Sequence, residues 1–276
     1  MIVEQGHGTP LVLIPGIQGR WEYMRPAVDA LSDYFRVITF PLCGERVSAH
    51  AFDASRGLDS YVDQVSSVLV EKRLPRAIVC GVSFGGVVAL RFAAAHPTRV
   101  AALVLASTPA PVWRLRPRHE IYVRAPWLFG PVFLAESPWR LRAELAAAFP
   151  DPGERRRFRR TVLRTLVGAP LSLSRMAKRA RLMNGMDLRA DCARIAAPTL
   201  VVTGERSLDH VVPADDSANY ARLISNARAV VVERTGHLGS ITRPDAFAAI
   251  VHDFVDECDD ARQQGSDSQP DRHPVA

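Results

Sequence analysis

The sequence predicts an α/β protein, in which a mostly parallel sheet of six or seven strands has helices on both faces and carries a helical cap insertion. Short β-branched or apolar runs alternate with amphipathic stretches, which is typical of consecutive β-α-β units. The apolar runs are hydrophobic along their whole length, as expected for strands buried on both faces. The alternation stops between Thr108 and Ala190 and resumes afterwards, which indicates an insertion between two strands.

The individual elements follow from these patterns. Six strands are expected at residues 11–14, 36–40, 76–80, 100–106, 199–203 and 228–233, with residues 2–4 as a candidate seventh. Helices are expected between them, at residues 22–31, 60–71, 84–96, 214–224 and 245–257. The core that contains the sheet would comprise residues 1–107 and 191–257, and the cap residues 108–190. Residues 258–276 are polar and are expected to be a disordered tail.

Composition excludes several classes of protein. A chain of 276 residues with 47% apolar residues can bury a full core without metal or disulfide support. Its four cysteines are far apart and form no C-x-x-C pair, so we expect neither a metal site nor a redox dithiol. The first ten residues lack the basic and apolar regions of a signal peptide, and no apolar run approaches the length of a membrane span. These features predict a cytoplasmic protein.

Positive charge is concentrated in the cap. Residues 108–190 contain 17 Lys and Arg but only 6 Asp and Glu, whereas the rest of the chain is mildly acidic. Such a surface can simply be solvated, or it can bind nucleic acid, anionic lipid or an acidic carrier protein. We expect no nucleic-acid partner.

A Gly-x-Ser-x-Gly segment, residues 81–85, lies between an expected strand and an expected helix. A sharp turn at this point would place the Ser83 hydroxyl clear of the sheet and at a helix N-terminus, where developing negative charge is stabilised. Ser83 is therefore the candidate nucleophile. Cys80, on the preceding strand, is interpreted as a small core residue.

A serine nucleophile needs a base and a group that orients the base. His237 follows the last strand and precedes the last helix, which places it at the carboxyl edge of the sheet, where Ser83 must also lie. Asp209 lies beyond the end of the strand at 199–203 and four residues before Pro213, and it is favoured as the orienting acid. Glu205, in the same loop, is its main rival.

Two backbone amides are expected to form an oxyanion hole, because fixed N–H donors need no reorganisation during the reaction. One is the amide of Phe84, and the other is the amide of Ile17 in the turn after the first full strand. The residues expected to line the substrate pocket are Gln18, Trp127, Phe129, Phe133 and Leu238.

Together these residues resemble the α/β-hydrolase family, in which an elbow serine, an acid and a histidine follow one another along the chain. The resemblance covers residues 10–255, and the insertion resembles that family's cap domain. Two segments depart from the family pattern: Pro15 stands where His is common before the oxyanion turn, and residues 40–48 lack the usual D-x-x-G-x-G-x-S motif.

The resemblance implies the α/β-hydrolase fold and a serine carboxylesterase that acts on a small acyl substrate without a cofactor. A carbon–carbon bond hydrolase of the dienoate type is the alternative on the same triad. A second alternative is a non-catalytic binding protein that uses the basic cap surface. Family esterases that receive acyl groups from an acidic carrier through cap arginines make such a carrier a candidate partner.

Overall fold

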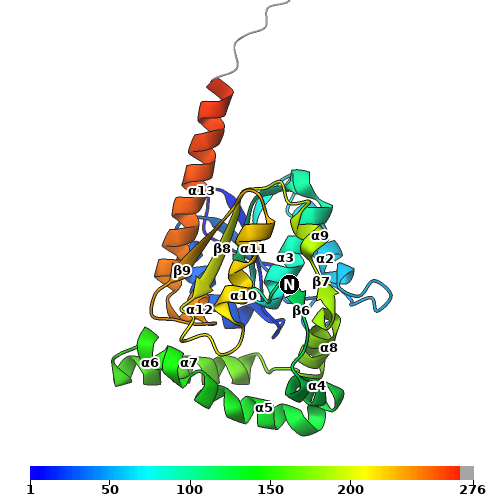
Figure 1. Ribbon diagram of the computed structural model, residues 1–276, viewed down its shortest axis with the longest axis vertical. Coiled ribbons are helices and arrows are strands. Elements are labelled where there is room, and N and C mark those ends of the chain that lie inside the picture. The colour runs from blue at the N-terminus through cyan, green and yellow to red at the C-terminus, as the bar shows by residue number, and fades with distance from the viewer. Residues whose placement is uncertain (268–276) are drawn as a thin grey trace, which may run out of the picture.

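A seven-stranded sheet forms the centre of the computed structural model, which describes residues 1–267 (Figure 1). Its strand order is β1-β3-β2-β4-β5-β8-β9, and all neighbours are parallel except β1, which pairs antiparallel with β3. The strands are β1 (Val3–Gln5), β2 (Pro10–Ile14), β3 (Arg36–Thr39), β4 (Ala77–Val82), β5 (Val100–Ala106), β8 (Thr199–Gly204) and β9 (Ala227–Val232). The predicted fold class is confirmed, including the seventh strand.

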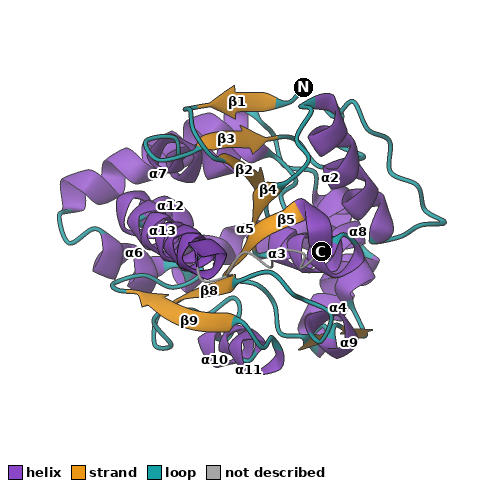
Figure 2. Ribbon diagram, turned by 90° about the horizontal axis from the view of Figure 1, so that it is seen from above, coloured by secondary structure: helices purple, strands orange, loops and turns teal. Residues whose placement is uncertain are grey.

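Helices cover both faces of the sheet (Figure 2). On one face, α2 (Asp59–Glu71) and α3 (Phe84–Ala95) enclose one cluster of buried apolar side chains. On the other, α1 (Arg25–Leu31) and α13 (Pro244–Asp267) enclose a second cluster. Alternate residues of each central strand enter opposite clusters, which explains why these strands are apolar throughout.

The remaining core helices are short. A 3₁₀ turn, η1 (Trp21–Met24), precedes α1, and a second one, η2 (Pro97–Arg99), leads into β5. The helix expected at residues 214–224 is divided into α10 (Ala214–Ala218) and α11 (Tyr220–Leu223). Two more short helices complete the core, α9 (Arg189–Cys192) and α12 (Gly239–Thr242).

The cap lies across the end of the core at which the parallel strands terminate (Figure 1). It contains α4 (Pro117–Arg124), α5 (Pro126–Arg140), α6 (Arg142–Ala148), α7 (Pro152–Gly168) and α8 (Leu173–Met183). Two strands that were not expected, β6 (Val112–Trp113) and β7 (Met186–Asp187), pair antiparallel at its base. This pairing joins the two chain segments that enter and leave the cap.

The last helix is longer than the sequence predicted. We expected disorder from residue 258, but α13 continues to Asp267. No proline interrupts residues 258–267, and half-buried Cys258 packs against the cluster beneath α13. The rest of the expected tail, residues 268–276, lies outside the described residues. Within residues 1–267, no helix combines the length and the apolar character that crossing a membrane requires.

Candidate active site

Ser83 lies at a strained turn between β4 and α3. Its backbone dihedrals are φ 55° and ψ −120°, a conformation that residues other than glycine rarely adopt. The two flanking glycines allow the turn to be this tight, because a Cβ on Gly81 would lie 2.2 Å from the Gly85 carbonyl oxygen, and one on Gly85 would lie 2.2 Å from that of Ile14. Ser83 is half-buried, whereas the neighbouring residues of the turn are buried.

The strain at Ser83 leads to a stability prediction. Ser83→Gly and Ser83→Ala both remove the hydroxyl, but only glycine relieves the positive φ. We expect the glycine variant to be about 1 kcal/mol more stable to urea unfolding than the alanine variant. Equal stability of the two variants would show that the turn holds no such strain.

The loop after β2 passes directly beside Ser83. A Cβ built on Gly16 would lie 3.5 Å from the Ser83 Cβ, so the two backbones approach closely. Within the described residues, the Ile17 N–H donates no hydrogen bond to another protein group. Phe84 begins α3, and the first N–H groups of a helix have no partner inside it. Both amides predicted for the oxyanion hole are therefore free to receive a ligand oxygen.

Asp209 and His237 lie next to each other. Asp209 Oδ2 is 3.6 Å from His237 Nδ1, and Asp209 Oδ1 accepts hydrogen bonds of 2.9 Å from the Val211 and Val212 amides. These amides fix the carboxylate on the side of the imidazole. The rival acid, Glu205, accepts a hydrogen bond from the Arg234 amide instead.

Ser83 and His237 are not joined by a hydrogen bond among the described residues, and His237 Nδ1 is buried without a partner at hydrogen-bond distance. The reaction would require the contacts of His237 with Ser83 and Asp209 to tighten to hydrogen-bond distance. The parallel order β4-β5-β8-β9 nevertheless places the loops after β4, β8 and β9 at one edge of the sheet. All three candidate side chains belong to these loops.

A fully buried glutamate of the cap, Glu144 of α6, holds the loop that contains His237. Its Oε1 accepts hydrogen bonds from Thr235 Oγ1 at 2.8 Å and from the Leu238 amide at 2.7 Å, one on each side of the histidine. Its Oε2 has no hydrogen-bond partner. Burial raises the pKa of the Glu144 carboxyl, although these hydrogen bonds and the nearby His237 act in the opposite direction.

A buried ion pair also joins the cap to the core, beside the loop that contains Ile17. Arg179 of α8 donates from Nη2 to Glu45 at 2.6 Å and from Nη1 to the Ile17 carbonyl oxygen at 3.0 Å. Both side chains are buried, so each charge depends on the other. Neither this pair nor Glu144 was predicted from the sequence, because an arginine or glutamate in a highly charged cap gives no sign of being buried.

The residues predicted to line the pocket are distributed over several surfaces. Gln18 is beside Gly16, and Leu238 follows His237. Phe129 and Phe133 pack against Tyr122 within the cap, with ring centroids 6.1 and 6.2 Å from it. Trp127 is exposed to solvent, so we do not retain it among the proposed pocket residues.

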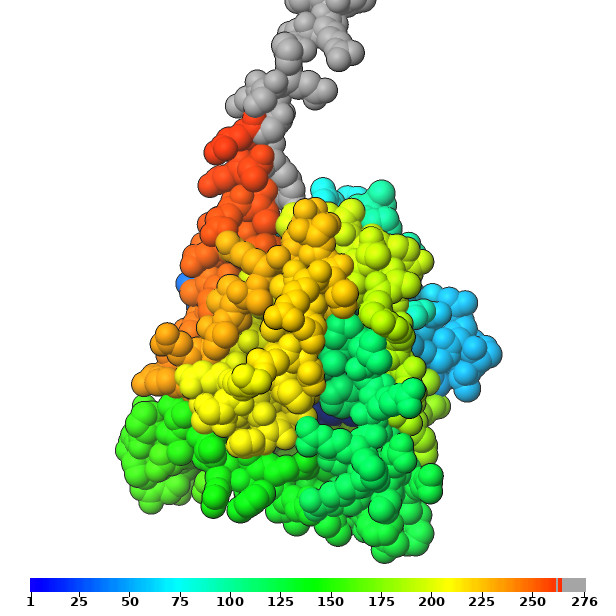
Figure 3. Space-filling model, in the orientation of Figure 1, coloured from blue at the N-terminus to red at the C-terminus, as the bar shows by residue number. Residues whose placement is uncertain are grey.

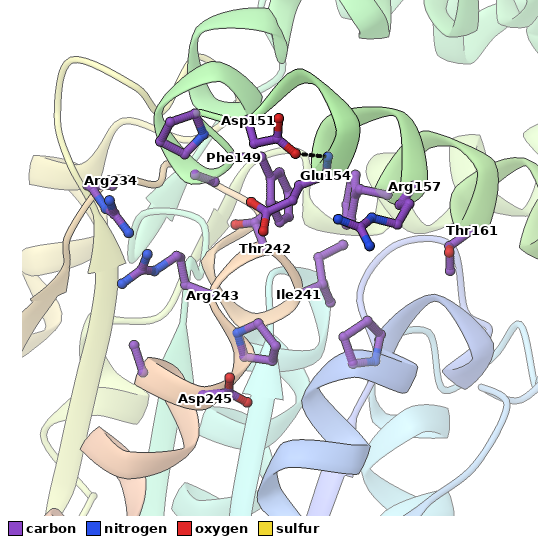
Figure 4. A pocket seen from close by; sticks show the side chains of 16 residues that line it. Phe149, Asp151, Glu154, Arg157, Thr161, Arg234, Ile241, Thr242, Arg243 and Asp245 are labelled. Carbon is purple, nitrogen blue, oxygen red and sulfur yellow. Dashed lines mark hydrogen bonds between the residues drawn. The ribbon is translucent and has the colours of Figure 1, made fainter.

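Two hollows are visible in the molecule. An opening between the cap and the core exposes residues from the N-terminal part of the chain (Figure 3). A separate groove of about 980 Å³ lies between α7 and the α12–α13 region and is lined by residues such as Phe149, Arg157 and Arg243 (Figure 4). Its lining contains none of the candidate catalytic residues.

Cys80 is fully buried, and burial raises the pKa of its thiol well above the usual range, which fits its interpretation as a core residue. Among residues 1–267, no three His, Cys, Asp or Glu side chains are grouped so that they could hold a metal ion.

Known proteins resemble this chain over most of its length. A 2-hydroxymuconate semialdehyde hydrolase from a Pseudomonas species is 29% identical over 94% of this chain and 90% of its own length. A pimeloyl-[acyl-carrier protein] methyl ester esterase from Nitrosomonas europaea is 28% identical over 88% of this chain and 94% of its own length. The crystal structure of a hydrolase from Pseudomonas aeruginosa superimposes with a TM-score of 0.73 at 25% identity, covering 92% of this chain and 93% of the other.

A family model described as the alpha/beta hydrolase family matches residues 11–250, which include β2, the Ser83 turn, the whole cap and the His237 loop. The match agrees with the sheet order and with the position of the cap between β5 and β8. The chain belongs to the alpha/beta hydrolase family.

Proposed function

We propose that this hydrolase cleaves carboxylic esters through an acyl-enzyme formed on Ser83. The observation that carries the proposal is the strained Ser83 turn, which holds a half-buried hydroxyl beside two backbone amides, those of Ile17 and Phe84. Stabilisation of an oxyanion by such fixed donors is a major contribution to acyl transfer.

In this proposal, Ser83 Oγ attacks the ester carbonyl carbon while His237 accepts the hydroxyl proton. Asp209 orients the imidazole through Nδ1, and the two amides hold the negative oxygen of the tetrahedral intermediate. The carbon–oxygen bond to the alcohol then breaks, and the alcohol leaves with the proton from His237. Water repeats the sequence on the acyl-enzyme, with His237 as base, and releases the acid and free Ser83.

A second candidate is hydrolysis of a carbon–carbon bond in a dienoate substrate. It is favoured by the similarity to 2-hydroxymuconate semialdehyde hydrolase, at 29% identity over 94% of the chain. The same nucleophile and base would serve both reactions, so the substrate must distinguish them.

Labelling with a fluorophosphonate, followed by mass mapping of the modified peptide, tests the nucleophile before any substrate is known. We expect a single adduct on Ser83 in the wild type. Turnover should then be compared between a panel of p-nitrophenyl acyl esters and a dienoate ring-fission product. Absence of labelling at Ser83, together with inactivity on both substrates, would favour the non-catalytic binding protein instead.

The prediction of an acidic carrier protein as acyl donor is supported by the similarity to a pimeloyl-[acyl-carrier protein] methyl ester esterase. The basic surface proposed for it consists of the exposed arginines of α7: Arg156, Arg157, Arg159, Arg160 and Arg164. If a carrier docks there, kcat/KM for a carrier-bound ester should fall steeply with salt, whereas kcat/KM for the free ester should not.

A further inference from the structure

The solvent-facing side of α5 is entirely apolar. Trp127 and Trp139 are 77% and 67% exposed, and the exposed residues between them follow helical spacing. We call this set the cap stripe: Trp127, Leu128, Pro131, Val132, Leu134, Ala135, Pro138 and Trp139. The stripe extends for about 18 Å along the helix at a rise of about 1.5 Å per residue.

The opposite side of α5 packs on the cap and is apolar up to Phe133, beyond which it carries Glu136, Ser137 and Arg140. Phe129 and Phe133 contact Tyr122, and Gly130 lies so close to Leu173 that an added Cβ would be 2.5 Å from a Leu173 methyl group. An exposed apolar face of this length is normally covered by a partner or by lipid. Here α5 lies along the outer edge of the cap, away from the sheet (Figure 1).

The segment that contains the cap stripe is basic. Residues 114–142 contain six arginines and two glutamates. Neither glutamate is fully exposed, and Glu136 is paired with Arg118. Arg142 lies over the Trp139 ring, 5.3 Å from its centroid, so a cation and an aromatic ring are presented together at one end of the stripe.

We propose that the cap stripe docks the protein on an anionic lipid surface. Tryptophan prefers the boundary between headgroups and acyl chains, and the smaller apolar residues of the stripe can enter the same layer. Arginines beside an apolar helix face attract anionic headgroups. The protein would then bind in the plane of the membrane surface, with α5 in contact with the lipid and the sheet on the far side of the cap. This surface is distinct from Ser83 and does not depend on the proposed reaction.

The charge pattern argues against a second copy of this chain as the occupant. A two-fold symmetric dimer would place the same basic region of each copy against the other, at a cost in electrostatic repulsion. An acidic carrier protein would satisfy the arginines, but charge complementarity does not require a continuous apolar helix face with a tryptophan at each end.

Vesicle flotation tests the proposal on the full chain. We expect binding to vesicles of phosphatidylcholine with a minority of phosphatidylglycerol, weaker binding to phosphatidylcholine alone, and a blue shift of tryptophan emission on binding. The double variant Leu128→Asp/Val132→Asp should bind the anionic vesicles at least about tenfold more weakly than the wild type. The matched control is Val70→Asp, an exposed valine on α2 of the core, which should bind like the wild type.

Turnover of a soluble ester and far-UV circular dichroism should be unchanged in these variants, so that loss of binding is not loss of fold. Trp127→Ser/Trp139→Ser provides a second variant and should also abolish the emission shift. Three results would overturn the proposal: no vesicle binding by the wild type, vesicle binding that is insensitive to both double variants, or a dimer in solution that Val132→Asp dissociates. A shift of tryptophan emission produced by acyl carrier protein but not by vesicles would assign the stripe to that partner instead.

Discussion

Changing Ser83 to alanine is expected to lower kcat for ester hydrolysis by roughly 10⁴-fold or more, because the variant cannot form the acyl-enzyme. Substrate binding should be much less affected, since the Ile17 and Phe84 amides that we propose as the oxyanion hole belong to the backbone and remain in place. The measurement is kcat and KM on the best ester of the panel, with the variant at high concentration to detect residual turnover.

Ser83→Ala should also fail to react with the fluorophosphonate that labels the wild type. A control for general damage is Ser67→Ala, because Ser67 is an exposed serine on α2 whose hydroxyl donates only to the Asp63 carbonyl oxygen. That control should keep wild-type activity and labelling. Turnover by Ser83→Ala at the wild-type rate would remove the basis of the proposed mechanism.

Glu144→Ala is expected to reduce both stability and turnover. The substitution leaves the Leu238 amide and the Thr235 hydroxyl without their buried acceptor. We expect a loss of about 2–4 kcal/mol in the free energy of unfolding. Because the two groups flank His237, the imidazole should also be misplaced, lowering kcat by about 10²-fold with little change in KM.

Glu144→Gln separates the hydrogen bonds from the charge, since it retains an acceptor oxygen but cannot ionise. Burial raises the pKa of the Glu144 carboxyl in the folded protein. At low pH the carboxyl is protonated in both the folded and the unfolded protein, and its full contribution to the free energy of unfolding is present. As the pH rises through and above the ordinary glutamate range, the unfolded protein releases this proton more readily, and the free energy of unfolding falls. The stability of Glu144→Gln relative to the wild type should therefore improve between about pH 4 and pH 7.

Urea unfolding at several pH values measures this difference. Glu154→Ala is the matched control, because Glu154 is an exposed glutamate of the cap. The free energy of unfolding of this variant should differ from that of the wild type by less than about 0.5 kcal/mol. If Glu144→Ala were as active and as stable as this control, Glu144 would have no role in holding the His237 loop.

Most of the core was predictable from local pattern. Strands such as β5 are apolar along their whole length because both of their faces are covered, and that pattern is visible in the sequence. Even the short edge strand β1 was expected. The β6–β7 pair was not, because two-residue strands have no periodicity to detect. The end of α13 was also placed too early, because a polar composition is typical of exposed helices as well as of disordered tails.

The candidate site was predictable where topology alone determines position. Ser83, Asp209 and His237 all follow strands of one parallel sheet, so their common edge follows from chain order. Glu144 and the Arg179–Glu45 pair could not be predicted, because their burial depends on how the cap docks on the core. No local pattern in the sequence specifies that docking.

The two buried carboxylates have a consequence for how ligands enter. Glu45 of the core accepts a hydrogen bond from Arg179 of α8, and Glu144 of α6 accepts one from Thr235 of the core. The cap is therefore attached to the core at both α6 and α8. It cannot swing away as one rigid flap without also releasing the turn at Ile17 and the segment around His237. Among the described residues, α4 and α5 have no ion pair to the core. We therefore expect ligands to reach Ser83 by passing beneath α4 and α5, and we expect these two helices to move while the Ile17 and His237 loops stay in place.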